Sequence, residues 1–264
     1  MKLLNIVHGQ KGGVGKSTWT KILLEYYISK KWQYKLFDLD AGSLDVGCIY
    51  DPNRYQKNTA KKQQIAENKV QNNEQYFLQF TDNKNSKDDV DIIFEAATKQ
   101  NVIVNLPSNI KHLYYPWIKD NDLINLAKEV KMTIIQWFVS SGEPNSITEF
   151  LETIDSFTNC DNFKHIFVKN YGEEENWAKV LEQNKNLRET LEADKIITVD
   201  FPEFSPSRFK IIVENNLTFA AAKDSDKLNI IAKSALSQWL NKCAMELDAV
   251  FEELKVLKPV AEKK

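Results

Sequence analysis

A glycine-rich stretch near the N-terminus constrains the fold of this chain more than any other feature. It reads His-Gly-Gln-Lys-Gly-Gly-Val-Gly-Lys-Ser-Thr over residues 8–18 and follows a short apolar run at residues 3–7. A helical pattern of apolar residues begins directly after it, and we expect that helix to run from about residue 16 to 30. Strand, glycine loop and helix in this order are typical of a P-loop. The sequence therefore predicts an α/β fold, with three layers and a mostly parallel sheet flanked by helices.

The residue types in this loop suit the binding of a nucleotide. Closely spaced glycines let successive backbone N–H groups point at phosphate oxygens, and the following helix adds its positive N-terminal dipole. Lys16 would reach the β- and γ-phosphates, and the Ser17 hydroxyl would hold Mg²⁺. A glycine turn that only joins strand to helix is the alternative. We predict ATP and Mg²⁺ as cofactors, with ATP bound by Gly12, Gly13, Val14, Gly15, Lys16, Ser17 and Thr18.

Two residues distinguish this loop from the common form. Gln10 stands where the first glycine of the motif is usual, and Lys11 adds a second lysine. Residues 11–18 resemble the deviant Walker A motif of the ParA/MinD family of P-loop ATPases, and Gln10 is similar to its ParA branch. The resemblance extends in order to about residue 220. It implies a homodimer formed on ATP binding, in which Lys11 acts catalytically on the partner's nucleotide.

Length, composition and cysteine spacing indicate one soluble cytoplasmic domain over residues 1–264. The chain has 42% apolar residues, a net charge of −2 and a pI of about 6.0, so no global charge indicates nucleic-acid or membrane binding. The three cysteines at positions 48, 160 and 243 are far apart, which disfavours a zinc site. No stretch approaches eighteen uncharged residues, so we expect no stable membrane insertion.

Two aspartates follow the second predicted strand, at residues 34–37. Carboxylates at the C-terminal end of a strand beside a P-loop lie where α/β sheets place their chemistry. The segment resembles the family's switch I, which implies that Asp38 orders Mg²⁺ through water and that Asp40 positions the attacking water. An ordinary strand followed by an acidic turn is the alternative.

The strand predicted at residues 101–105 departs from the family pattern at its end. Asn105 stands where the family's switch II segment carries aspartate. An asparagine can hydrogen-bond a Mg²⁺-bound water but brings no negative charge, which puts hydrolysis in doubt. Alternatively, Asn105 only ends a core strand.

Residues 51–87 carry a weaker signal. We expect a polar helix at 59–69 and a short strand or helix edge at 75–80. The basic residues of this region (Arg54, Lys57, Lys61, Lys62 and Lys69) favour a solvated helix over a nucleic-acid face, because no aromatic residues interleave with them. A helix opened by Ser86 should turn Ile92, Ile93, Ala96 and Ala97 inward.

The second half continues the alternation of strands and helices. We expect strands at 132–139, 165–169 and 196–199, and helices at 123–129 and from about 145. An aromatic cluster at 112–117, just before a helix, is expected in the core, with packing on a partner's switch region as the alternative. The turn at residues 140–144 is ordinary helix-start chemistry, so we predict no function there. The family resemblance implies that Asn170 contacts adenine and that Pro202 flanks it, with Phe201 or Phe204 over one face of the base.

The C-terminal segment, about 226–258, reads as one helix. Its apolar residues recur near helical spacing and include Leu228, Ile231 and Trp239. A membrane-seeking helix is the alternative to packing on the domain or on another subunit, but the acidic polar face opposes binding to anionic lipid.

These features favour an ATP-dependent dimerisation switch with slow hydrolysis, acting in DNA partition, plasmid mobilisation or intracellular positioning. The expected partners are a second copy, an adaptor or activator protein and, indirectly or non-specifically, DNA. Two alternatives stay open: a nucleotide-binding scaffold that has lost turnover through Asn105, and a metabolic P-loop synthetase, against which Lys11 argues.

Overall fold

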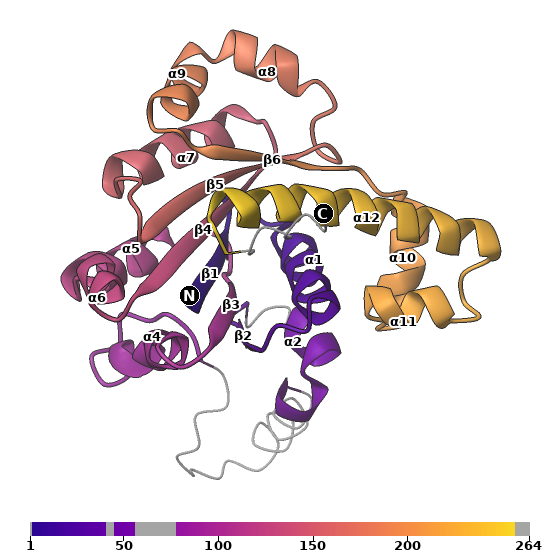
Figure 1. Ribbon diagram of the computed structural model, residues 1–264, viewed down its shortest axis with the longest axis horizontal. Helices are drawn as coiled ribbons and strands as arrows, with labels where there is room; N and C mark the ends of the chain where they lie inside the picture. Colours follow the sequence, from indigo (N-terminus) through magenta and orange to yellow (C-terminus); the bar gives the residue numbers. More distant parts are fainter. Residues whose placement is uncertain (1, 41–44, 56–77, 257–264) are drawn as a thin grey trace, which may run out of the picture.

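Six parallel strands in the order β2-β3-β1-β4-β5-β6 form the centre of the computed structural model, which describes residues 2–40, 45–55 and 78–256 (Figure 1). The strands are β1 Lys2–His8, β2 Tyr34–Asp38, β3 Asn101–Asn105, β4 Met132–Ser140, β5 Phe163–Asn170 and β6 Ile197–Phe201. The helices are α1 Lys16–Ser29, α2 Asp45–Tyr50, η1 Lys87–Val90, α4 Asp91–Ala97, α5 Lys111–Asp120, α6 Leu123–Glu129, α7 Pro144–Ser156, α8 Trp177–Gln183, α9 Lys185–Ala193, α10 Pro206–Glu214, α11 Phe219–Asp224 and α12 Ile230–Glu253.

Helices cover both faces of this sheet, which confirms the predicted three-layer α/β fold. On one face α1 and α12 lie across the strands (Figure 1), and Trp19, Trp137 and Phe251 are buried between these helices and the sheet. Aromatic side chains of α5, including Tyr114 and Trp117, are buried on the other face. The predicted aromatic core cluster is confirmed, although it lies inside a helix rather than before one. Strands buried on both faces explain the nearly continuous apolar runs in the sequence.

Two helix faces are predicted correctly except for one residue on each. In α4, Ile93, Ala96 and Ala97 are buried as predicted, but Ile92 is 49% exposed, and Phe94 is buried as well. Ile231 is 67% exposed, whereas Ala232 is buried. The side chain of Asn229 accepts a hydrogen bond from Ala232 N at 2.8 Å and caps α12. The helix therefore begins at Ile230, and the prediction that residues 226–229 are helical is wrong.

The predicted segment at 59–69, with its lysines, and the tail beyond 256 lie outside the described residues, as do residues 75–77. Residues 78–80 form neither strand nor helix. Arg54 packs on the ring of Phe37 and donates to Leu36 O at 2.7 Å, so this basic side chain supports the β2 edge of the sheet. Among the described helices none is both long and apolar enough to cross a membrane.

Strand register brings the predicted functional residues together. Val7 lies opposite Asn105, and Asn105 lies opposite Asp38, so β1, β3 and β2 end side by side. The P-loop begins where β1 ends, and α1 leads away from the same edge. The C-terminal edge of the sheet therefore carries the candidate site, as the parallel topology requires.

Candidate nucleotide site

The backbone of the glycine loop has the conformation and the free donors of an anion site. Gly13 and Gly15 have φ angles of 87° and 96°, in the left-handed region that favours glycine. Within the described residues, the backbone N–H groups of Gly12, Gly13, Val14 and Gly15 donate to no protein acceptor. Four free donors at the start of a fourteen-residue helix form a concave binding site for phosphate oxygens.

The two lysines of the loop are oriented differently. The Lys16 ammonium is nearly buried and donates to Lys11 O at 2.7 Å and to Ser108 Oγ at 2.8 Å. The Lys11 ammonium lies 2.6 Å from Glu143 Oε2, and both of these side chains are about half exposed. Lys16 is thus held by two neutral oxygens, in the position where phosphate oxygens would replace them, whereas Lys11 lies at the surface in an ion pair with Glu143.

Burial changes the acidity of Lys16. Desolvation lowers the pKa of Lys16 to about 8, although the negative charges of Asp40 and Glu149 oppose the shift. A buried ammonium without a full countercharge is an unsatisfied group, and the phosphates of a nucleotide would supply that countercharge.

Hydrogen bonds connect the predicted metal-side residues in one buried network. Asn105 Nδ2 donates to Asp38 Oδ1 at 2.9 Å, and Asn105 Oδ1 accepts from Thr20 Oγ1 at 3.1 Å. Ser17 Oγ lies 3.5 Å from Asn105 Nδ2, so the hydroxyl of the P-loop and the ends of β2 and β3 converge. Asn105 is fully buried. Its amide donates to one neighbour and accepts from the other, which an ionised aspartate could not do.

Asp38 anchors the segment that follows β2. Its Oδ2 accepts from Gly47 N at 2.8 Å, and its Oδ1 also accepts from Asp40 N at 3.4 Å. Burial raises the pKa of Asp38, and the hydrogen bond from Asn105 opposes that shift. Asp40 is partly exposed, and its negative charge stabilises the Lys16 ammonium more than that of Glu149 does. The structure therefore places Asp38 inside the network and Asp40 at its open side.

The residues present fit a nucleotide with Mg²⁺. Free loop N–H groups and the Lys16 ammonium match phosphate oxygens, while the Ser17 hydroxyl and the Asp38 carboxylate are hard oxygen donors of the kind Mg²⁺ prefers. A bound Mg²⁺ would neutralise phosphate charge. With Asn105 in the network, this site offers one carboxylate where two are usual in the family it resembles.

A small cavity beside the P-loop contains the residues predicted to contact the base. It measures about 150 Å³ and is lined by Gly13, Gly15, Thr18, Asn170, Gly172, Glu173, Phe201, Pro202, Glu203, Phe204, Phe209 and Trp239. Typical small-molecule sites measure about 300–1,000 Å³, so this one suits a single ring system. Trp239 was not predicted for this site, because it lies on α12, and its Nε1 donates to Pro202 O at 2.7 Å.

Asn170 has a structural role that the sequence did not reveal. Its Nδ2 donates to Val14 O at 3.0 Å and its Oδ1 accepts from Gly172 N at 2.9 Å. A Cβ on Gly15 would approach Asn170 Nδ2 to 2.7 Å. Asn170 therefore fixes the shape of the P-loop, and one amide hydrogen is left for a ligand.

Sequence reasoning missed Ser108 and Glu143, which contact the two loop lysines. It also missed His8, which is fully buried between Tyr115 and Phe138, with Nε2 at 3.5 Å from Glu149 Oε1. Desolvation and the charge of Lys16 lower the pKa of His8 to about 3, so the imidazole is neutral and packs as an aromatic residue behind the loop. No local sequence signal pairs residues so far apart in the chain.

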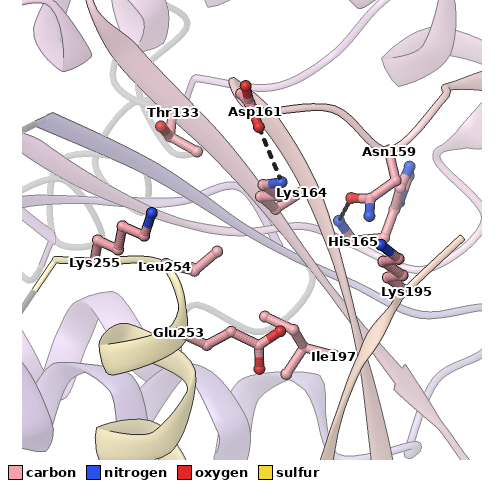
Figure 2. Close-up of a pocket in the computed structure, with 10 residues that line it drawn as sticks. All are labelled: Thr133, Asn159, Asp161, Lys164, His165, Lys195, Ile197, Glu253, Leu254 and Lys255. Atoms are coloured by element: carbon pink, nitrogen blue, oxygen red, sulfur yellow. Dashed lines mark hydrogen bonds and ion pairs between the residues drawn. The ribbon is translucent and has the colours of Figure 1, made fainter.

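A larger cavity lies at the opposite edge of the sheet, away from the P-loop. It measures about 460 Å³, and Lys164, Lys195 and Lys255 surround it (Figure 2). Lys195 and Lys255 follow the C-terminal ends of α9 and α12, where a cation offsets the negative end of the helix dipole. Asp161 lies 3.8 Å from Lys164. These charges are accounted for by the helix ends and the neighbouring acids.

Comparisons with known proteins support the family resemblance of the motif. No family model matches the chain. Protein MobD of Acidithiobacillus ferrooxidans is 23% identical over 254 residues, which cover 96% of this chain and 99% of MobD. A Borrelia burgdorferi B31 protein assigned to plasmid partition, solved with AMPPNP, has a TM-score of 0.51 at 14% identity and covers 92% of this chain and 98% of its own.

The structure of pNOB8 ParA bound to nonspecific DNA is similar in the same way. Its TM-score is 0.50 at 12% identity, over 94% of this chain and 99% of that one. At these identities the structural likeness establishes the fold. The chain thus has the fold of the ParA-like P-loop ATPases that its loop motif resembles.

Proposed function

We propose that this protein is an ATP-dependent dimerisation switch that binds Mg²⁺·ATP and hydrolyses it slowly. The observation that carries the proposal is that the side chains of the two loop lysines, Lys11 and Lys16, point in different directions. Lys16 is buried and bound to oxygens of its own subunit, whereas the Lys11 ammonium is directed to the surface. Two lysines on one set of phosphates would repel each other, so an outward Lys11 suits the nucleotide of a second copy across a two-fold axis.

In this proposal each residue of the site has one role. The loop N–H groups and Lys16 bind the phosphates, Ser17 holds the metal, Asp38 orders the metal through water, and Asp40 orients the attacking water. Lys11 stabilises developing charge on the partner's γ-phosphate, as a trans-acting arginine finger does. Hydrolysis then depends on dimer assembly.

Asn105 supports a second candidate, a nucleotide-binding scaffold with little or no turnover. Because its amide already satisfies Asp38 and Thr20, the network is complete without a metal. Steady-state ATPase with saturating Mg²⁺, with and without DNA, separates the two candidates. The switch requires measurable turnover in at least one condition, and the scaffold requires none.

The biological role and partners are inferred from the similar proteins. MobD and the partition protein support a role in mobilisation or partition, and the DNA-bound ParA supports DNA as a non-specific partner. An adaptor that triggers hydrolysis and a cytoplasmic site of action complete the proposal. A metabolic synthetase is less well supported, because it has no use for an outward Lys11.

Light scattering with a slowly hydrolysed ATP analogue tests the proposal. The wild-type protein should double its mass when the site is filled, while Lys11→Ala should bind the analogue and stay monomeric. A wild-type protein that remains monomeric with a filled site, or a Lys11→Ala variant that dimerises normally, would refute the switch.

A further inference from the structure

In the single subunit the Lys11 ammonium forms an ion pair with the carboxylate of Glu143. Glu143 Oε2 lies 2.6 Å from Lys11 Nζ, the distance of a charge-assisted hydrogen bond. The two residues are 132 positions apart in the sequence, so the contact is made by the fold rather than by a local turn.

Hydrogen bonds fix the turn before α7 that carries Glu143. Gly142 has a φ of 77°, and its N–H donates to Ser140 Oγ at 3.2 Å. Ser140 Oγ in turn lies 2.9 Å from Ser146 Oγ, which ties the turn to the first part of α7. A Cβ at Gly142 would meet Glu174 at 3.0 Å, so the turn packs closely against Glu174 and favours glycine at this position.

Glu143 occupies the N-cap position of α7 but makes no capping hydrogen bond with its side chain. N-caps are usually Ser, Thr, Asp or Asn, whose side chains bond the free N–H groups of the first turn. Here the helix instead has Pro144 at its start, which lacks one of those donors. The Glu143 carboxylate is thus free of a helix role and is directed to the P-loop.

We propose that Glu143 is a positioning residue that holds Lys11 in its own subunit and so opposes dimerisation until nucleotide is bound. The inference rests on the proposed function, in which Lys11 must reach the partner's γ-phosphate. Lys11 leaves Glu143 when it crosses the interface, and ATP, with up to four negative charges, competes successfully with one carboxylate for the ammonium. Two-fold symmetry means that both pairs break for each dimer formed.

The expected size of the effect follows from the exposure of the pair. The side chains of Lys11 and Glu143 are 41% and 52% exposed, so the pair belongs to the weak class of surface ion pairs. Breaking two such pairs per dimer corresponds to a shift of about 2- to 30-fold in the dimer dissociation constant. Glu143→Gln should therefore dimerise at a correspondingly lower protein concentration in the presence of the ATP analogue.

The test uses Glu143→Gln with Glu189→Gln as a matched control, which removes another exposed ion pair, between Lys185 and Glu189 on α9. Sedimentation equilibrium with the analogue gives the dissociation constants. The proposal expects tighter dimerisation in Glu143→Gln only. An unchanged or weaker dimer would overturn it, the weaker dimer by showing that Glu143 supports the interface.

A second readout separates this proposal from the switch itself. In the nucleotide-free monomer, the reaction of Lys11 with an amine-reactive reagent, followed by mass spectrometry, should be faster in Glu143→Gln than in wild type or Glu189→Gln. Equal rates would show that Glu143 does not hold Lys11. A faster rate together with a wild type that never dimerises would keep the ion pair but refute both the switch and the opposing role of Glu143.

Discussion

Replacing Asn105 by aspartate should destabilise the nucleotide-free protein in a pH-dependent way. In the wild type the Asn105 amide donates to Asp38 Oδ1 at 2.9 Å, and both residues are buried. Asn105→Asp puts a second carboxylate at that distance. If both were ionised, their repulsion would be about 6 kcal/mol at an effective dielectric constant of about 20.

Protonating one of the two carboxyls is less costly. At pH 7 the cost is about 4 kcal/mol for a carboxyl with an ordinary pKa, and at pH 5 about 1.5 kcal/mol. The pair therefore takes up a proton, keeps a hydrogen bond, and has one pKa raised above its unfolded value. Unfolding then releases that proton, so the free energy of unfolding falls as pH rises from about 4 towards the raised pKa.

Urea unfolding in EDTA at pH 5, 6 and 7 measures this difference. Relative to wild type, Asn105→Asp should lose about 2–3 kcal/mol more stability at pH 7 than at pH 5. Asn186→Asp, which adds the same charge at an exposed position of α9, should show no such trend. Mg²⁺·ATP should stabilise Asn105→Asp more than wild type, because a divalent cation favours two carboxylates over one.

If the stability difference between Asn105→Asp and wild type were the same at pH 5 and pH 7, the buried carboxyl pair would be refuted. If turnover rises in the same variant, the missing carboxylate limits hydrolysis in the wild type. If turnover is unchanged, Asp38 and Ser17 suffice to hold the metal.

Three further predictions concern the candidate site. Because burial lowers the pKa of Lys16 to about 8, the nucleotide-free protein should gain stability relative to Lys16→Met as pH rises from about 8 to 10, as thermal unfolding would show. Over the same pH range its affinity for ATP should fall, as calorimetry would show. Gly15 has a left-handed φ, and a Cβ there would lie 2.7 Å from Asn170 Nδ2. Gly15→Ala should therefore lose about 2 kcal/mol or more of stability in urea unfolding, and it should also bind ATP more weakly. Asp40→Asn should leave ATP affinity within about threefold of wild type but lower kcat by at least tenfold, as single-turnover hydrolysis would show; unchanged kcat would remove Asp40 from catalysis.

The sequence predicted the parts of the fold whose signals are local. The apolar runs at β1, β3 and β4, the glycine loop and the start of α1 agree with the structure, because strand burial and P-loop geometry depend on neighbouring residues. Ile92 of α4 and Ile231 of α12 were wrongly placed on inward faces, since helical spacing indicates which side of a helix is buried but not where that buried side ends.

The contacts of the candidate site were only partly predictable. Parallel topology places Asp38 and Asn105 beside the P-loop, and the register of β2 and β3 agrees with that reasoning. The pairing of Lys11 with Glu143 depends on how α7 packs, and the sequence of its turn suggested no function. The amide of Asn170 was assigned to the base from the family resemblance, whereas its hydrogen bond to Val14 O arises from tertiary packing.

Subunit mixing tests most directly whether Lys11 acts across a dimer. Lys11→Ala keeps its own nucleotide site but offers no trans lysine, and Lys16→Ala offers Lys11 but binds nucleotide poorly. By light scattering, each variant alone should stay monomeric with the ATP analogue. When donor-labelled Lys11→Ala and acceptor-labelled Lys16→Ala are mixed, energy transfer should appear with the analogue, because the mixed dimer contains one complete composite site. Dimers formed by Lys11→Ala alone, or the absence of energy transfer in the mixture when wild-type subunits do show it, would contradict the account.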